Sequence, residues 1–276
     1  MITGDGEGFD IAMASAGTYA SMQDLYAKWP EFAEWAAAEA TSQPSGAFDP
    51  NDLEAPSPAP RQVFAVGLNY LDHISEAGLQ VPDEPAVFTK FVSSLAGPHC
   101  DVILPSGNVD WEVELVVVIG KVTRTVKAQD AWSHVAGLTV GQDISERDLQ
   151  LVGNPAQFSL GKSFPGFAPT GPVLVTPDEF DNPSDLEIGC YLNGEQMQKA
   201  RTSQLVFPID MLIEKLSAVL TLYPGDIIFT GTPAGVGAVQ SPPRYINAGD
   251  ELVSYIEGIG RLTQNFRNSS SKRMIG

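Results

Sequence analysis

One stretch of the sequence, from Asp110 to Lys121 (DWEVELVVVIGK), constrains the fold more than any other. Leucine, valine and isoleucine run without a break from Leu115 to Ile119, and neither glycine nor proline interrupts them. Branched aliphatic side chains in a short continuous run are typical of a β-strand that is buried. The stretch therefore predicts one strand in the interior of a sheet.

Three carboxylates precede this run at alternate positions: Asp110, Glu112 and Glu114. Side chains alternate across a strand, so these three share one face, and Val116 and Val118 continue that face inward. Carboxylates so placed repel one another and lose hydration unless a cation or a proton joins them. A divalent cation with oxygen ligands would satisfy them, and so would a strand end that lies in solvent. This stretch alone leaves both interpretations open.

The bulk properties of the 276-residue chain exclude several classes of protein. Its length allows one main domain with a small appendage, and its 43% hydrophobic and 18% charged residues are typical of globular proteins. A formal net charge of −18 opposes binding to nucleic acid or to anionic membranes. No run of about 18 apolar residues is present, so no membrane span is expected.

The N-terminus and the cysteines indicate where such a protein works. Met1 to Asp10 lacks the basic and apolar regions of a signal peptide. The two cysteines, Cys100 and Cys190, are too few for a disulfide framework and fit a reducing compartment. We therefore expect a soluble cytoplasmic protein.

Residues 1–60 differ from the rest in composition. They carry ten acidic side chains and one basic side chain, Lys28. Ser21 predicts the start of a short helix, and Pro30 predicts the start of a second. Residues 41–60 are rich in proline, serine and acidic or amide side chains, which indicates a linker. We predict a small acidic N-terminal segment and linker over 1–60, followed by a catalytic domain over 61–276.

A candidate general base lies in a short predicted helix between Gly67 and Gly78. His73 and Glu76 are three residues apart, so they are neighbours on one helix face. A carboxylate beside an imidazole fixes its tautomer and raises its basicity, as a water-activating base requires. A surface ion pair is the commoner interpretation of an isolated His-x-x-Glu.

Two lysines are candidate contacts for an anionic substrate. Lys90 lies in a short predicted strand over 88–91, and a solvated side chain is the usual interpretation for this residue type. Lys162 is the single basic residue of an ordered loop over 158–172 that is dense in glycine, proline and aromatics. There it would be a salt-bridge partner or a group that polarises a substrate, and composition does not decide between these.

Two strand ends deliver further polar groups. The predicted strand Gly137–Gly141 ends at Asp143, which would be a metal ligand or the cap of the next turn. A glycine-rich loop over 231–237 follows another predicted strand. Its spacing fits no nucleotide-binding motif, and Pro233 removes a backbone donor, so we reject a nucleotide site. Thr232 in this loop remains available to a small ligand.

The order of elements is rich in strands, with few helices between them. A β-hairpin is predicted over 186–200, with a type I′ turn at Asn193-Gly194. This order argues against a doubly wound sheet and favours an α+β fold that is mainly β.

Several segments together resemble the fumarylacetoacetate hydrolase family. They occur in the family's order across residues 61–265. The similar segments are Gly67–Tyr70 with His73 and Glu76, Asp110–Leu115 with Gly120-Lys121, Gly137–Gln150, Gly161–Phe164, Pro169–Pro172, Pro224–Asp226 and Gly231–Gly237.

The resemblance implies a mixed β-sandwich or roll, the C-terminal-domain fold of that family, usually in a homodimer. It implies a Mg²⁺ or Mn²⁺ ion held by Glu112, Glu114 and Asp143. It also assigns the remaining site residues by motif: a lid dyad, His73 and Glu76; an active-site lysine, Lys162; and substrate contacts, Gln150 and Thr232. Lys90 is added to the substrate contacts on chemical grounds. Asp110 receives no metal role, and we expect it at the solvated mouth of the strand.

The function expected from this reading is metal-assisted hydrolysis of a carbon–carbon bond in a β-diketone acid, such as an acylpyruvate or fumarylpyruvate. His73, held by Glu76, would activate the attacking water, and Lys162 would stabilise oxyanion charge. Decarboxylation of oxaloacetate and isomerisation of a 2-hydroxy-dienoic acid are alternatives on the same site. A metal-dependent binding protein without turnover is the alternative from another class.

Overall fold

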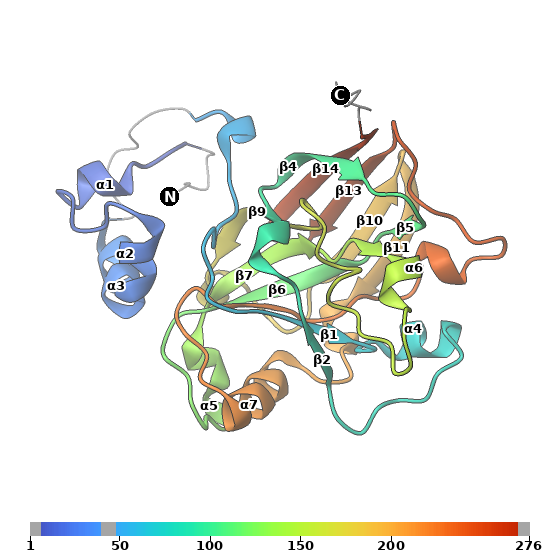
Figure 1. The fold of residues 1–276 in the computed structure, drawn as a ribbon. Coiled ribbons are helices and arrows are strands. Elements are labelled where there is room, and N and C mark those ends of the chain that lie inside the picture. The colour runs from blue at the N-terminus through green and yellow to red at the C-terminus, as the bar shows by residue number, and fades with distance from the viewer. Residues whose placement is uncertain (1–6, 40–47, 270–276) are drawn as a thin grey trace, which may run out of the picture.

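The computed structural model describes residues 7–39 and 48–269, in which seven α-helices and fourteen strands occur (Figure 1). The helices are α1 (Ile11–Ala14), α2 (Met22–Ala27), α3 (Trp29–Glu39), α4 (Leu71–Glu76), α5 (Ala128–Ala131), α6 (Arg147–Gln150) and α7 (Ile209–Val219). The strands are β1 (Val63–Gly67), β2 (Ala86–Thr89), β3 (Leu95–Ala96), β4 (His99–Leu104), β5 (Val109–Asp110), β6 (Val113–Ile119), β7 (Val135–Gln142), β8 (Ser145–Glu146), β9 (Ala168–Val175), β10 (Glu187–Leu192), β11 (Glu195–Arg201), β12 (Ile227–Phe229), β13 (Glu251–Ile256) and β14 (Gly260–Asn268).

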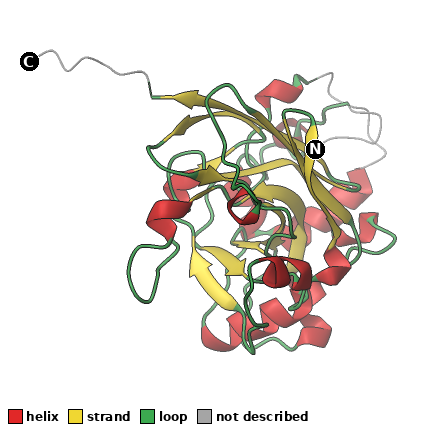
Figure 2. Cartoon of the chain, turned by 90° about the vertical axis from the view of Figure 1, so that its right-hand side faces the viewer, coloured by secondary structure: helices red, strands yellow, loops and turns green. Residues whose placement is uncertain are grey.

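Two mixed sheets form the body of the molecule. The larger has seven strands in the order β2-β1-β12-β6-β7-β9-β3, and the smaller has five in the order β11-β10-β13-β14-β4. Most neighbouring pairs are antiparallel, but β1–β12, β3–β9 and β4–β14 are parallel. The short pair β5 and β8 makes a separate two-stranded ribbon. Figure 2 shows strands in the centre and helices around them, as expected for a fold that is mainly β.

The main core lies between the two sheets. Alternate residues of β6, namely Val113, Leu115 and Val117, are at most 1% exposed and face this core. They pack in one cluster with buried side chains of the five-stranded sheet, including Ile188 and Leu252. Burial of one such aliphatic side chain stabilises the fold by roughly 1.5 to 3 kcal/mol. The strand pairing around β6 therefore rests on a continuous apolar layer.

The opposite face of β6 is covered by the N-terminal helices. Val116 and Val118 belong to a second cluster, to which α2 and α3 contribute aromatic rings. Trp29 lies directly against Gly120, where an added Cβ would be 2.6 Å from Trp29 Cδ1. Figure 1 shows α1, α2 and α3 together on one side of the body, with α4 and α6 on the opposite side. The segment is thus packed against the sheet, and the domain boundary at residue 60 stays a prediction.

Two predicted elements differ from the structure. The stretch from 110 to 121 is not one strand, because it breaks at Trp111 and Glu112 between β5 and β6. The loop predicted over 158–172 ends earlier than expected, since β9 begins at Ala168. Proline lacks a backbone donor and normally disfavours a strand, but β9 tolerates Pro169 and Pro172 because its pairing with β7 is irregular and with β3 very short.

Other local predictions are confirmed. Ser21 caps α2 by accepting a hydrogen bond from the Asp24 backbone. The hairpin of β10 and β11 turns at Asn193 and Gly194, whose φ angles of 52° and 80° suit a type I′ turn. Part of the predicted linker, residues 41–47, lies outside the described residues. Among the described helices, none is long and apolar enough to cross a membrane.

Candidate metal centre and active site

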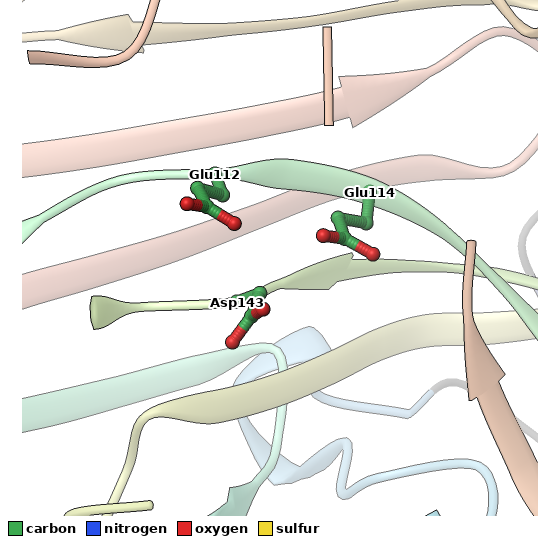
Figure 3. Close-up of side chains that lie close together, drawn as sticks. All are labelled: Glu112, Glu114 and Asp143. Atoms are coloured by element: carbon green, nitrogen blue, oxygen red, sulfur yellow. The ribbon is translucent and has the colours of Figure 1, made fainter. Parts of the chain in front are cut away.

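Three buried carboxylates from two neighbouring strands form the centre of the site. Glu112 immediately precedes β6, Glu114 lies within it, and Asp143 follows the end of β7. A ligand oxygen of each lies within 4.8 Å of the others, and Figure 3 shows the three side chains close together, with both glutamates extending toward the strand that leads to Asp143. None is more than 6% exposed. The structure thus brings together the three residues assigned to the metal by resemblance.

The sheet itself aligns these side chains. Glu114 shares a face with Val116, because side chains alternate along β6. Its partner across the sheet is Gly141, where a Cβ would lie 2.5 Å from Val116 Cγ2. Just beyond the ladder, the Asp143 backbone N–H donates to the Glu112 carbonyl at 2.9 Å. The two glutamates and the aspartate are therefore held on rigid backbone.

Two buried lysines approach this cluster. Lys162 Nζ donates to Glu112 Oε2 at 2.8 Å and to Asp143 Oδ2 at 2.7 Å. Lys90 Nζ donates to Asp143 Oδ1 and to the backbone carbonyl of Lys162. The usual interpretation of Lys90 as solvated is wrong, since it is 1% exposed. Lys90 directly follows β2, which pairs with β1, and its side chain turns inward toward Asp143, whose charge offsets the cost of burial.

Arg147, at the start of α6, is a site residue that the sequence did not reveal. Its guanidinium donates to Asp110 Oδ2 at 2.7 Å, to Glu112 Oε1 at 2.6 Å and to Gln150 Oε1 at 2.9 Å. The two acids lie 37 and 35 positions away in the chain. Because both acids are distant in the sequence, only tertiary contacts identify the role of Arg147.

The expectation that Asp110 lies in solvent is wrong. Asp110 is 0% exposed and accepts hydrogen bonds from the backbone N–H groups of Gly237 and Ala238 at 2.7 and 2.9 Å. With Arg147 as its counter-ion, it joins the glycine-rich loop to the metal cluster. A carboxylate can be buried at this depth because it is fully paired.

The three central carboxylates differ in their electrostatic surroundings. Burial would raise the pKa of Glu112, but the charges of Lys162, Arg147 and His73 lower it to about 2. Burial raises the pKa of Glu114 well above its ordinary value, and the charges of Asp143 and Glu112 raise it further. Glu114 accepts from the Gly231 backbone N–H at 2.7 Å, but among the described residues it has no ion pair with a lysine, arginine or histidine.

The predicted dyad forms on α4. His73 Nδ1 lies 2.8 Å from Glu76 Oε1, and their side chains are 13% and 24% exposed. Glu76 also accepts from the Gly235 backbone N–H, at 3.0 Å to Oε2. Nδ1 is thereby committed to Glu76, which leaves Nε2 of His73 to accept a proton. Glu76 and Glu114 accept hydrogen bonds from the same glycine-rich loop, at Gly235 and Gly231, so this loop links the dyad to the carboxylates.

Two predicted substrate contacts already have partners in the protein. Gln150 is 7% exposed and accepts from Arg147. Thr232 donates its hydroxyl hydrogen to the Val113 carbonyl at 2.9 Å and accepts from Gln198 Nε2 at 2.8 Å. Thr232 can therefore only accept a further hydrogen bond unless it releases Val113. Gln198, on β11, is a second positioning residue that the sequence did not reveal.

Comparison with known proteins identifies the family. The family described as fumarylacetoacetate (FAA) hydrolase C-terminal matches residues 62–267, well over half of the chain. The chain belongs to the fumarylacetoacetate hydrolase family. The resemblance found in the sequence motifs is confirmed, and so is the α+β fold that is mainly β, which the family's structures share.

Similar members of the family have several names. Mitochondrial oxaloacetate tautomerases of Bos taurus and Homo sapiens are each 50% identical over 208 residues, 75% of this chain and 66% of theirs. The chain thus spans 66% of the length of these curated relatives. A crystal structure of a putative HpcE protein from Mycobacterium smegmatis is 53% identical, with a TM-score of 0.92 over 98% of this chain and 96% of that chain. A fumarylpyruvate hydrolase from Pseudomonas aeruginosa, solved with Mn²⁺ and pyruvate, is 31% identical, with a TM-score of 0.69 over 75% of this chain and 90% of that chain.

The residues present fit a hard divalent cation. Carboxylate oxygens are the ligands that Mg²⁺ and Mn²⁺ prefer, and three lie close together here. Glu114 is buried beside two other acids, and no cationic side chain of residues 7–39 or 48–269 forms an ion pair with it. A buried carboxylate in that position is stabilised if a cation joins it. The cluster is therefore a candidate metal centre, and the identity of its ion stays a prediction.

Proposed function

We propose that this protein is a metal-dependent enzyme that moves a proton next to the carbonyl of a short 2-oxo acid. Its preferred reaction would be keto–enol tautomerisation of an oxaloacetate-like acid. The observation that carries this proposal is the His73–Glu76 dyad, which the glycine-rich loop links to a buried cluster of three carboxylates and a lysine. The relatives named oxaloacetate tautomerases support the choice of substrate.

The metal would be Mg²⁺ or Mn²⁺ held by Glu112, Glu114 and Asp143. When bound, it would supply Lewis-acid stabilisation of negative charge on the substrate oxygens. The protein side chains alone are nearly balanced, since three cations (Lys90, Arg147 and Lys162) face four acids (Asp110, Glu112, Glu114 and Asp143). The two positive charges of a bound divalent ion would change the net charge of these groups from −1 to +1. Such a site favours an anionic substrate.

The protein's own groups would move the proton. His73 Nε2 would remove a proton from the carbon beside the carbonyl, and Glu76 would stabilise the imidazolium that results. Lys162, buried next to the cluster, would stabilise the charge that develops on the carbonyl oxygen. Return of the proton to oxygen or carbon completes the tautomerisation. The dyad is partly exposed, so it can exchange protons with solvent after each turnover.

Hydrolysis of a carbon–carbon bond in an acylpyruvate is the second candidate. The same dyad, 13% and 24% exposed, could equally deprotonate a water molecule. The solved fumarylpyruvate hydrolase, whose crystals contain Mn²⁺ and pyruvate, favours this candidate. Decarboxylation of oxaloacetate and isomerisation of a hydroxy-dienoic acid need the same charge stabilisation without an attacking water.

One set of assays separates these reactions. The purified protein is incubated with oxaloacetate and with acetylpyruvate, each with Mg²⁺, with Mn²⁺ and with chelator. Faster relaxation of the oxaloacetate enol absorbance, without carbon dioxide or pyruvate release, supports tautomerisation. Loss of the diketone with release of pyruvate selects hydrolysis instead. No metal-dependent change in either substrate would contradict an enzymatic role at this site.

The dyad is tested separately from the metal. His73→Ala should reduce turnover about 10²- to 10⁴-fold, because it removes the general base, and should leave Mn²⁺ affinity unchanged. His99→Ala is the control, since His99 is exposed on β4. Full activity in the His73 variant would exclude the dyad from the reaction.

Assembly and location remain predictions. We propose that the protein acts as a homodimer, on the basis of the family resemblance, and that it works in the cytoplasm, because its free cysteines, Cys100 and Cys190, fit a reducing compartment. Light scattering after size exclusion measures the first, and fractionation of the source cells measures the second.

A further inference from the structure

Tyr70 stands out among the buried polar side chains. It immediately precedes α4, the helix that carries the dyad, and it is 2% exposed. Its hydroxyl is buried and has no hydrogen-bond partner, a property that only Gln264 Oε1 shares among the side-chain atoms of the described residues. A buried hydroxyl without a partner costs free energy, so its presence needs an explanation.

The backbone around Tyr70 is fixed in place. Leu68 has a φ of +55°, in the left-handed region that a leucine rarely adopts. The Asn69 side chain donates to the carbonyls of Phe207 and Thr230 at 3.0 and 2.7 Å and accepts from the Phe207 N–H at 2.7 Å. Strain that surrounding bonds hold in place is typical of functional segments. Tyr70 therefore has little freedom to turn toward a partner elsewhere.

The segment that carries Tyr70 packs against the glycine-rich loop that binds Glu114. Glu114 accepts from the Gly231 N–H, and a Cβ on Gly231 would lie 2.6 Å from Asn69 Cβ. Burial raises the pKa of Tyr70, and the charge of Glu114 raises it further, so the phenol keeps its proton. It is thus a protonated donor that lies near Glu114 and makes no hydrogen bond to it.

The other unpartnered atom has different surroundings. Gln264 lies on β14 in the five-stranded sheet, and its amide nitrogen donates to the Pro98 carbonyl at 3.0 Å. Its oxygen is an acceptor within the sandwich and adjoins none of the groups assigned to the reaction. Tyr70 is the candidate whose position and chemistry both relate to the site.

We propose that the Tyr70 hydroxyl donates a hydrogen bond to a carboxylate or enolate oxygen of the substrate. The inference rests on the proposed function and extends it by naming a further substrate-binding residue. Because Tyr70 leads directly into α4, the same segment would contact the substrate and carry the base, His73. Substrate binding would thereby restrain the helix that positions the dyad.

The test uses oxalate as the probe. Oxalate is a planar dianion whose adjacent oxygens imitate the enolate of a 2-oxo acid, and it does not turn over. Its affinity is measured by calorimetry on the Mn²⁺-loaded wild-type and Tyr70→Phe proteins. We expect the substitution to weaken oxalate binding about tenfold or more, because one hydrogen bond to a charged group is lost. Mn²⁺ affinity, measured by electron paramagnetic resonance without oxalate, should not change.

A thermal melt without ligands separates this role from a structural one. Tyr70→Phe should leave the Tm unchanged or raise it, because the hydroxyl that it removes has no partner to lose. Tyr255→Phe is the matched control: its hydroxyl donates to Glu187 Oε1 at 2.9 Å, between two strands of the five-stranded sheet. It should lower the Tm and leave oxalate binding unchanged.

Two failures can be distinguished. If the wild-type protein binds Mn²⁺ and oxalate, and Tyr70→Phe binds oxalate equally well, the assignment of Tyr70 is overturned while the proposed function stands. A lowered Tm in Tyr70→Phe with unchanged oxalate affinity overturns it as well. If the Mn²⁺-loaded wild-type protein does not bind oxalate, the proposed function itself fails, and Tyr70 has no substrate to contact.

Discussion

The ammonium group of Lys162 lies 2.7 Å from the carboxylate of Asp143, and both side chains are at most 2% exposed. Burial acts to lower the pKa of Lys162, but Asp143 and Glu112 raise it above its ordinary value. The lysine therefore remains charged at neutral pH inside the protein. If either residue of this pair is removed, the charge of the other stays buried and loses an ion-pair partner.

Lys162→Met should remove that charge with little change in volume. We expect kcat to fall about 10²- to 10³-fold, as for loss of one group that stabilises an oxyanion. The metal-free protein should lose about 3 to 5 kcal/mol of stability, because buried acids lose a counter-ion. Kinetics and urea unfolding measure the two effects. Lys199→Met, at an exposed salt bridge, is the control and should change neither.

Glu114→Gln should separate metal binding from folding. The variant should bind Mn²⁺ about 100-fold or more weakly, since one of three carboxylate ligands is lost. The metal-free variant should be at least as stable as the wild type, because a neutral amide costs less free energy to bury than a carboxylate. Calorimetry and thermal melts measure these quantities. Unchanged Mn²⁺ affinity would remove Glu114 from the ligand set.

Arg147→Lys should show that the guanidinium is needed for its geometry. Arg147 contacts Asp110, Glu112 and Gln150 at once, and the compact ammonium of lysine cannot reproduce that fork. We expect a loss of about 2 to 4 kcal/mol in the free energy of unfolding, together with weaker oxalate binding. Arg244→Lys, at an exposed pair with Glu195, is the matched control. Equal stability in both variants would contradict a special role for Arg147.

The contact between Trp29 and Gly120 can be tested by a double-mutant cycle. Trp29→Ala should destabilise the protein by about 3 to 5 kcal/mol, because a buried ring is lost. Gly120→Ala should cost about 1 to 3 kcal/mol, because the new Cβ meets the ring at 2.6 Å. The two changes together should cost less than their sum. Additive effects would show that the N-terminal helices do not rest on this part of the sheet.

The two cysteines predict how the protein responds to alkaline pH. Burial, and then the charge of Asp101, raises the pKa of Cys100 from 9.0 to about 11. Alkylation of Cys100 by iodoacetamide should therefore be slow at pH 8 and rise about tenfold per pH unit toward pH 11. In the unfolded protein this thiol loses its proton at a lower pH than in the folded protein. Its contribution to the free energy of unfolding is therefore lost as the pH rises from 9 to 11. Cys190, fully buried, should stay unmodified in the native protein. Fast modification of Cys100 at pH 8 would contradict its raised pKa.

The local elements follow from the sequence because they depend on near neighbours. The apolar run of β6, the hairpin turn at Asn193-Gly194 and the cap at Ser21 are each specified by side chains within a few residues. The pairing of His73 with Glu76 has the same origin, since one helical turn separates them. The alternation of Glu112 and Glu114 also predicts that they share a face.

Which charges are buried, and what they contact, depends on contacts that form only when the chain folds. Asp110 and Lys90 read as solvated in the sequence, yet partners from distant elements, Arg147 and Asp143, enclose them. The sequence likewise did not predict the unpartnered hydroxyl of Tyr70 or the packing of Trp29 on Gly120. The physical reason is that the free energy of a buried charge or polar group depends on atoms brought together by folding. Residue type and local spacing do not contain that information.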